Sequence, residues 1–208
     1  MTKIAIIDGV TGAGKTSVLT LLAENCHKSY WDEVVVIDED RTLGNILDQY
    51  QNPDWRANPT FEAIEATVAF LEQMSASENA DRKLILVERL HLTTYALFPK
   101  WEKLRSFDER LGRLNAVNVL LTFPPRETEA RSIERADRAD QNWAARMDQW
   151  LGSRRNAVLE IRRSQQRRWH ALAFSRLSFL HIDTRGRDWM RYAKTITAFL
   201  EPPMLEHN

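Results

Sequence analysis

One short segment near the amino terminus constrains the fold of this chain more than any other. Every fixed position of the pattern G-x-x-x-x-G-K-[ST] is filled by Gly9-Val10-Thr11-Gly12-Ala13-Gly14-Lys15-Thr16. The segment directly follows the apolar run Ile4–Ile7 and directly precedes a stretch that reads as a helix, residues 15–26. Glycines let backbone N–H groups converge on phosphate oxygens without side-chain clashes, and the helix start adds its positive dipole end. The sequence therefore predicts a strand, a phosphate-binding loop and a helix in succession.

The residue types in this loop predict a nucleotide with a divalent cation. Lys15 is expected to reach the β- and γ-phosphates of ATP, and the Thr16 hydroxyl is expected to bind Mg²⁺. We predict that the whole run from Gly9 to Ser17 contacts the nucleotide. Two alternatives remain at this point. One is a chance glycine-rich turn with a solvent-facing Lys15. The other is a degenerate loop that still folds but no longer supports catalytic turnover.

The hydrophobic pattern predicts an α/β fold. Five short apolar runs read as strands, and helical stretches, among them residues 61–74, alternate with them. Because the runs are continuously apolar, we expect a doubly wound, mostly parallel five-stranded sheet that helices cover on both faces. We expect one domain over residues 1–200, with a lid at about 126–150, and a loose tail over 201–208. The expected strands are residues 3–8, 34–37, 84–87, 117–123 and 179–183.

Composition excludes several classes of protein. The chain has 208 residues, of which 43% are hydrophobic and 28% charged, so it can bury a sizeable core and is not a disordered protein. No apolar run approaches the roughly 20 residues of a membrane span. The single Cys26 allows no internal disulfide and no cysteine-rich zinc site. We therefore expect a cytoplasmic protein with no membrane partner.

Net charge is zero, but its distribution is uneven. Residues 126–191 hold fifteen Arg, no Lys and nine acidic residues. The planar guanidinium suits phosphate esters, whereas zero net charge gives no reason to expect a nucleic-acid partner. Arg131, Arg135 and Arg138 are spaced so that a helix would place them on one face. The alternative for any one of these arginines is a solvated helical surface.

Acidic residues follow two of the expected strands. Asp38-Glu39-Asp40 ends the second strand and Glu88-Arg89 ends the third. In an open α/β sheet the site lies beyond the carboxyl ends of the strands, so we expect these groups and the loop to share one crevice. Glu39 or Asp40 is the candidate base for an acceptor hydroxyl. Turns favour acidic residues in any case, which is the alternative here.

Glu88 and Arg89 have separate expected roles. Glu88 would hold Mg²⁺ through water or fix Arg89, and Arg89 would grip the acceptor oxygen or the transferred phosphoryl group. The alternative is an ordinary salt bridge at a strand end. Arg41 would offset the repulsion that the neighbouring acids exert on an incoming phosphate.

Several separate segments resemble the deoxynucleoside kinase and thymidylate kinase group of phosphotransferases. The sequence contains no Asn-Lys-x-Asp motif, which a GTP-binding switch protein would need to recognise the guanine base, so that class is excluded. The resemblance extends over most of the chain in order and spacing, and it implies an Arg-bearing lid that brings Arg131, Arg135 and Arg138 to the phosphates. It rests on Asp8-Gly9 with the loop, residues 38–47, residues 45–55, Leu86-Val-Glu88-Arg89 with Thr93 and Thr94, and Arg131-x-x-x-Arg135-x-x-Arg138.

The resemblance also implies an acceptor site and leaves the acceptor open. Trp55 and Phe61 lie where the similar nucleoside kinases stack the base, with core packing as the alternative. Glu62 stands where those kinases tend to carry Gln, which favours an amino-bearing base, a sugar hydroxyl or an aminated compound. Thr11 and Glu88 resemble the pattern of the nucleoside kinases more than that of the thymidylate kinases, whereas Leu43-Gly44 resembles the pattern of the thymidylate kinases.

Three functions from different classes follow. The leading hypothesis is an ATP- and Mg²⁺-dependent kinase of a nucleoside-like hydroxyl compound, with a nucleoside monophosphate as the alternative acceptor. A nucleotide-binding sensor without efficient transfer is the second hypothesis. An ATPase acting on protein or nucleic acid is the third, although the chain lacks the aromatic-basic interleaving of single-strand binders. Dimerisation is common in the families that the chain resembles, so a homodimer is a further expectation.

Overall fold

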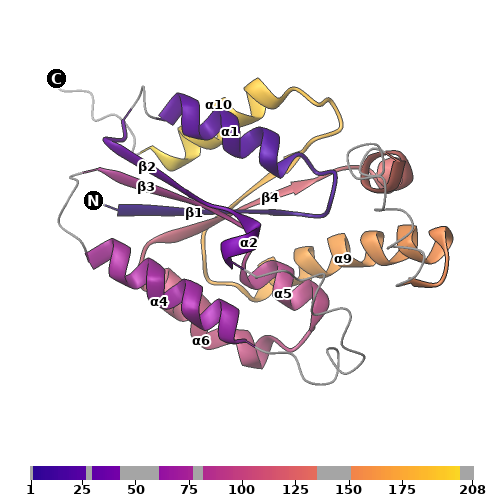
Figure 1. The fold of residues 1–208 in the computed structure, drawn as a ribbon, viewed down its shortest axis with the longest axis horizontal. Helices are drawn as coiled ribbons and strands as arrows, with labels where there is room; N and C mark the ends of the chain where they lie inside the picture. The colour runs from indigo at the N-terminus through magenta and orange to yellow at the C-terminus, as the bar shows by residue number, and fades with distance from the viewer. Residues whose placement is uncertain (1, 27–29, 43–60, 77–81, 135–150, 202–208) are drawn as a thin grey trace.

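The computed structural model describes residues 2–26, 30–42, 61–76, 82–134 and 151–201. Its centre is a five-stranded sheet in the order β2-β3-β1-β4-β5, in which every neighbouring pair is parallel (Figure 1). Crossover helices connect the strands, as parallel pairing requires. The strands are β1 (Thr2–Gly9), β2 (Glu33–Ile37), β3 (Lys83–Glu88), β4 (Ala116–Thr122) and β5 (Phe179–Asp183).

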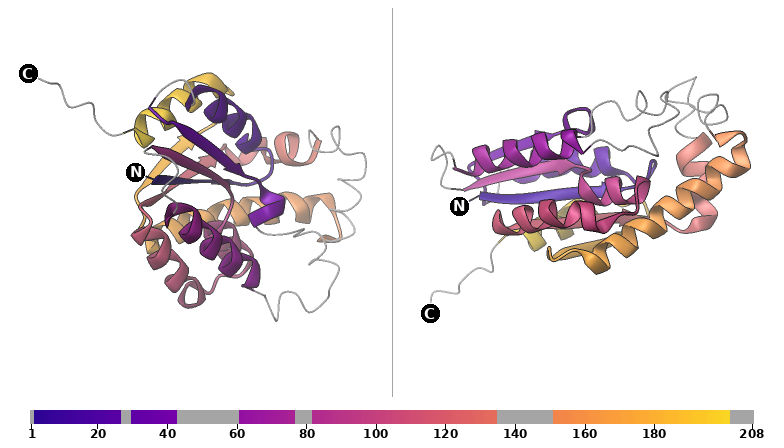
Figure 2. Two further views of the ribbon diagram at one scale, coloured as in Figure 1. Left: turned by 60° about the vertical axis from the view of Figure 1, so that its left-hand side comes forward. Right: turned by 90° about the horizontal axis from the view of Figure 1, so that it is seen from below.

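Helices cover both faces of the sheet. Helices α1 and α10 lie on one face, and α4, α5, α6 and α9 lie on the other (Figures 1 and 2). The short α2 lies at the carboxyl ends of the strands. The bounds are α1 (Lys15–Cys26), α2 (Glu39–Thr42), α4 (Glu62–Ala76), α5 (His91–Leu97), α6 (Trp101–Arg113), the 3₁₀ turn η1 (Pro125–Glu127), the π-helical turn η2 (Glu129–Glu134), α9 (Arg154–Phe174) and α10 (Trp189–Leu200).

Alternation along β1 divides the core into two layers. Ala5 and Ile7 join the cluster beneath α1 and α10, whereas Ile4 and Ile6 join the cluster above α4, α6 and α9. Successive side chains of a strand point to opposite faces, so a central strand must be apolar at every position. Each fully buried aliphatic side chain of this kind contributes about 1.5–3 kcal/mol. The two layers hold β1 in the middle of the sheet.

The edge strands depart from the expected pattern. The prediction of continuously buried strands is confirmed for β1, β3 and β4, but β2 and β5 are the outer strands and are only partly covered. Phe179 at the start of β5 is 48% exposed. An outer strand has a neighbour on one side only, and a helix layer of finite width leaves part of its surface uncovered.

The predicted fold class is confirmed: a single α/β domain with a five-stranded parallel sheet flanked by helices. All five expected strands are present, and the expected helices over 15–26 and 61–74 correspond to α1 and α4. Most of the expected lid, residues 135–150, and the tail over 202–208 lie outside the described residues. Among the residues that the structure describes, no helix is long and apolar enough to cross a membrane.

Candidate active site

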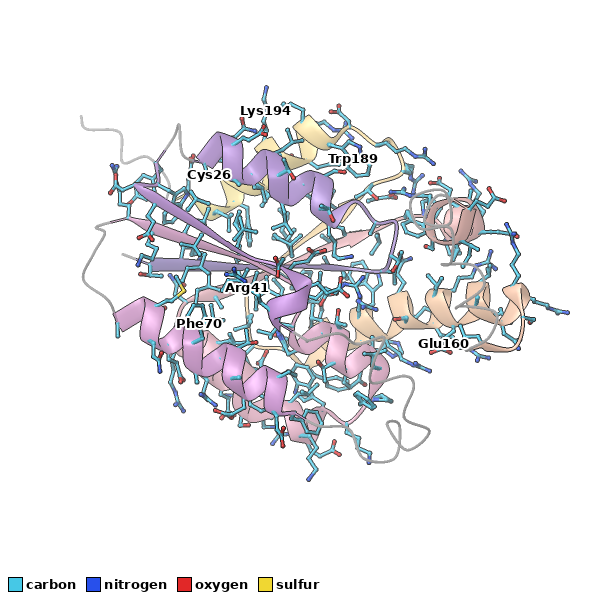
Figure 3. All side chains as sticks on the ribbon, in the orientation of Figure 1. Cys26, Arg41, Phe70, Glu160, Trp189 and Lys194 are labelled. Carbon is cyan, nitrogen blue, oxygen red and sulfur yellow. The ribbon has the colours of Figure 1, made fainter. Side chains whose placement is uncertain are left out.

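The phosphate-binding loop lies between the carboxyl end of β1 and the start of α1. Gly12 and Gly14 have φ angles of +80° and +94°, in the left-handed region that glycine adopts without strain. A Cβ at Gly12 would meet the carbonyl group of Arg131, and a Cβ at Gly14 would meet the ring of Trp189. Trp189 begins α10 beside the amino end of α1 (Figure 3). Both glycines are therefore required by conformation and by close packing.

The loop leads without a break into α1. The Ala13 amide donates to the Val10 carbonyl at 3.1 Å, and the Val18 amide donates to the Gly14 carbonyl at 3.0 Å. The first turn of α1 thus starts inside the glycine-rich segment, where its free N–H groups add to the positive end of the helix dipole. Thr16 is exposed in this turn. The geometry agrees with a loop that receives phosphate groups.

Lys15 is buried at the start of α1. The residue is 6% exposed, and its Nζ lies 3.8 Å from Oε1 of Glu88 at the end of β3. Burial, together with the nearby charge of Arg89, lowers the pKa of Lys15 to about 8. Burial also raises the pKa of Glu88, although Lys15 opposes that shift. The structure brings Lys15 and Glu88 together beside the loop, as the sequence predicted.

Arg89 and Glu39 form a second ion pair beside the first. Arg89 Nε lies 3.0 Å from Oε2 of Glu39, the first residue of α2. Arg89 has a φ of +59°, an unusual value for a residue with a side chain, and its amide donates to the Ile7 carbonyl at 3.0 Å. This backbone turn directs the chain out of β3 and into α5. Glu39 and Arg89 therefore lie next to Lys15 and Glu88.

Helix α2 is tied to the end of β3. The Thr42 hydroxyl donates to the Glu88 carbonyl at 2.9 Å, and the Thr67 hydroxyl of α4 donates to the Thr42 carbonyl at 3.1 Å. Arg41 is exposed on α2 and, with Phe70 of α4, lines a pocket of about 250 Å³ (Figure 3). The structure thus places Arg41 at the surface beside α4, one residue from the anchored Thr42.

Asp8, Thr93 and Arg168 form a buried network that the sequence analysis did not identify as one unit. Asp8 Oδ1 accepts from the Gly9 amide at 2.6 Å and from Arg168 Nε at 2.7 Å. Asp8 Oδ2 accepts from the Thr93 amide at 3.0 Å. Burial alone would raise the pKa of Asp8, but Arg168 holds it below its ordinary value. A charged residue at the end of an apolar strand is the signal that could have prompted a search for its partner.

Arg131 corrects one prediction. It was expected on a lid that closes over the phosphates, but it is 1% exposed and lies in η2 against the loop backbone. Its Nε donates to the Gly12 carbonyl at 3.1 Å, and its Nη atoms donate to the carbonyl and hydroxyl of Thr184 at 3.0 and 2.9 Å. The guanidinium also lies 4.4 Å from the centre of the Phe123 ring. In this structure Arg131 braces the loop from its protein side.

The structure describes some of the residues that were predicted to act on the acceptor side, and others lie outside the described residues. Phe61 packs against the core cluster, which favours the core alternative over base stacking, and Glu62 is exposed in the first turn of α4. The residues that lie outside the described part are Trp55, Arg135, Arg138 and the side chain of Asp40, together with the resembling segment 43–55.

The described residues fit a magnesium nucleotide. Within the described part of the chain, no group of three or more His, Cys, Asp or Glu side chains forms a metal cage. Magnesium does not need one, because it keeps several waters and takes the remaining oxygens from phosphates and one or two protein groups. Thr16, the residue after Lys15 in α1, carries a hydroxyl oxygen, and the Glu88 carboxylate lies 3.8 Å from Lys15 Nζ. Thr16 and Glu88 are the residues that would hold Mg²⁺.

No family model matches the sequence, and no curated protein sequence matches it either. Among solved structures, the chain is similar to the YorR protein of Bacillus subtilis, solved in complex with phosphorylated GDP, with a TM-score of 0.59, 13% identity and coverage of 94% of each chain. A shikimate kinase from Acinetobacter baumannii in complex with shikimate has a TM-score of 0.44, 16% identity and coverage of 95% of this chain and 91% of that chain. The likeness to YorR shows a shared fold.

Proposed function

We propose that this protein is a kinase that transfers the γ-phosphoryl group of Mg-ATP to a hydroxyl of a small, nucleoside-like molecule. The observation that carries the proposal is the row of contacts Lys15–Glu88 and Arg89–Glu39 beside the glycine-rich loop. A lysine that would bind phosphate and an ion pair between a carboxylate and a guanidinium therefore lie at the same edge of the sheet. The phosphorylated nucleotide held by YorR, a protein of similar fold, supports a nucleotide as the ligand of this loop.

The chain's own groups have distinct tasks in this reaction. Loop amides and Lys15 hold the β- and γ-phosphates and stabilise the charge that spreads over the γ-phosphoryl oxygens. Bound Mg²⁺ neutralises phosphate charge, and Thr16 and Glu88 would hold it. The bond from the γ-phosphorus to the bridging oxygen breaks, a bond to the acceptor oxygen forms, ADP leaves, and the acceptor proton passes to a carboxylate.

Among the carboxylates that the structure describes, Glu39 is our candidate to take that proton. Its side chain is half-buried, and Arg89 holds it at 3.0 Å beside Lys15 and Glu88. The pair with Glu39 also neutralises Arg89, which leaves little net positive charge on the acceptor side to attract a phosphate. A neutral hydroxyl acceptor therefore fits the charges better than a nucleoside monophosphate, which is the second acceptor class that we consider.

The direct test is ADP release with Mg-ATP across a panel of nucleosides, nucleoside monophosphates and aminosugars, with mass spectrometry of the products. We expect one class of nucleoside-like hydroxyl compound to raise ADP release and to gain one phosphoryl group. Phosphorylation of a monophosphate instead would correct the acceptor class. Tight ATP binding without acceptor-dependent ADP release would favour the nucleotide sensor and overturn the kinase proposal.

A further inference from the structure

Asp8 joins two parts of the site that are far apart in the sequence. One carboxylate oxygen accepts the amide of Gly9, the first residue of the phosphate-binding loop, at 2.6 Å. The other accepts the amide of Thr93 at 3.0 Å, and the Thr93 hydroxyl donates to the same carboxylate at 2.9 Å. Thr93 belongs to α5, which begins three residues after Glu88. Asp8 is therefore bonded both to the nucleotide loop and to the helix that continues from Glu88-Arg89.

Helix α5 depends on this carboxylate for its amino end. Its N-cap residue is Leu90, which makes no side-chain capping bond. Thr93 is the third residue of the helix, the position whose amide an N-cap side chain normally satisfies. Asp8 satisfies it from a different element, β1. The start of α5 and the start of the loop are thus fixed to one carboxyl group.

Arg168 holds that carboxyl group in place. It comes from the middle of α9 and is 2% exposed, and its Nε donates to Asp8 Oδ1 at 2.7 Å. Its Nη2 donates to the Thr93 hydroxyl at 2.9 Å, and its Nη1 donates to Ser164 one turn earlier in α9. The guanidinium therefore has bonding partners on β1, α5 and α9. A buried carboxylate without this partner would lose most of its charge compensation.

The same helix also braces the loop a second time, at Thr11, through η2. Arg154, the first residue of α9, bonds Glu129 at 2.6 Å and Glu134 at 3.1 Å, at either end of η2. Between them, Ser132 donates its hydroxyl to the Thr11 carbonyl at 2.6 Å. Figure 2 shows the amino end of α9 beside η2. Helix α9 is thus linked to the loop at Gly9 and again at Thr11.

We propose that Arg168 is a positioning residue: through Asp8 it sets the spacing between the phosphate-binding loop and the Glu88-Arg89 segment. The inference rests on the proposed function, since this spacing matters for bringing donor and acceptor groups together. Arg168 touches no reacting atom. It acts on the loop through the Gly9 amide and on the acceptor side through the start of α5.

The test compares Arg168→Met with a matched control, Arg110→Met. Arg110 also joins two helices by ion pairs, to Glu65 and Glu72 of α4, but it makes no contact with the loop. We expect Arg168→Met to lower Tm by about 10 °C and to raise the Kd for Mg-ADP by about tenfold, measured by calorimetry well below Tm. Arg110→Met lowers Tm and leaves that Kd within about twofold of the wild-type value.

Hydrogen exchange of the ligand-free protein separates this proposal from the kinase proposal. Faster exchange in both residues 9–16 and residues 88–97 of Arg168→Met, but not of Arg110→Met, supports the positioning role of Arg168 even if the wild-type protein binds no nucleotide. Unchanged exchange in either segment overturns it, whether or not the enzyme proves to be a kinase. An unchanged Kd for Mg-ADP in Arg168→Met would also overturn it.

Two further variants keep the proposal testable if Arg168→Met folds poorly. Arg168→Lys keeps the charge but not the forked donor geometry, so intermediate Tm and Kd values are expected. Asp8→Asn keeps the shape of Asp8 and removes its charge. If Arg168 acts through Asp8, the effects of Asp8→Asn and Arg168→Lys on the Kd for Mg-ADP are not additive in the double variant, whereas additive effects contradict the proposal.

Discussion

The two sides of the candidate site are built in different ways. On the nucleotide side, the loop from Gly9 to Thr16 is a contiguous segment whose backbone is bonded or packed on several sides, by Asp8, Arg131 and Trp189 among others. On the acceptor side, the groups come from α2 and the end of β3, and they meet through the ion pair of Glu39 and Arg89. Glu39 keeps about a third of its side-chain surface exposed, at 35%.

This difference implies that the two sides would bind the ligands of the proposed reaction in different ways. Amides fixed by packing need no rearrangement when phosphates arrive, so the nucleotide side is preorganised. Charges paired with each other across two elements must exchange partners when a ligand enters, so the acceptor side is adjustable. Substitutions on the nucleotide side should therefore weaken the binding of any nucleotide to a similar extent. Substitutions on the acceptor side should have effects on activity that depend on which acceptor is used.

The largest effect is expected on the nucleotide side, from Lys15→Met. If Lys15 binds the γ-phosphate as proposed, loss of its buried ammonium should lower turnover by at least about a thousandfold. Because burial already lowers the pKa of Lys15, replacing it with an apolar side chain should not lower Tm by more than a few degrees. Steady-state kinetics and thermal unfolding check both statements. A variant with wild-type turnover would remove Lys15 from the mechanism.

The acceptor side is tested by Glu39→Gln. If Glu39 takes the acceptor proton, kcat should fall by about 10²- to 10³-fold while the KM for the acceptor changes little. The Kd for Mg-ADP should stay within about twofold of the wild-type value, since the loop is untouched. Asp38→Asn is the matched control, because Asp38 is exposed and its carboxylate accepts a hydrogen bond from the Arg41 amide. Equal losses of kcat in both variants would contradict the role of Glu39.

The sequence predicts the position of the loop between β1 and α1 well because its information is local. A contiguous motif between an apolar strand and a helix identifies Gly9 to Thr16, and the apolar runs bounded by turns identify the five strands. Glu39, Glu88 and Arg89 were also found, since parallel strands bring their carboxyl ends to one edge. These predictions needed only the positions of the strands along the chain and their parallel direction.

The sequence fails where a pairing spans a long distance along the chain. Asp8 and Arg168 are 160 residues apart, and Arg168 is one of fifteen arginines in a region where spacing alone cannot separate buried from exposed ones. The same limit explains Arg131, whose spacing from Arg135 and Arg138 suggested an exposed face. Burial of an arginine depends on tertiary neighbours such as Thr184, which no local pattern encodes.

A smaller effect tests how tightly the nucleotide side is packed. Gly14→Ala places a Cβ against the ring of Trp189 at a φ of +94°, so both strain and overpacking should destabilise the fold, by about 2–4 kcal/mol in total. Gly152→Ala is the control, with a similar φ of +78° and nothing within 4 Å of the new Cβ, so strain alone should cost about 1–2 kcal/mol. Denaturant unfolding measures both values. Equal losses of unfolding free energy in the two variants would show that the Trp189 ring moves aside and that the loop is less rigid than proposed.

The smallest effect is a proton taken up by Lys15 when nucleotide binds. The pKa of Lys15 is about 8 in the free protein, below the ordinary 10.5, and phosphate charge should raise it again. At pH 8.5 binding of Mg-ADP should therefore take up about 0.7 proton, and above pH 8 its affinity should fall close to tenfold per pH unit. Calorimetry in buffers of different ionisation enthalpy measures the uptake, with Lys15→Met as the control that shows none. The same shift makes the unfolded chain bind more protons between pH 8 and 10.5, so the free energy of unfolding should rise with pH in that window. Binding without proton uptake at pH 8.5 would mean that the phosphates do not reach Lys15, and the contrast between the two sides would lose its basis.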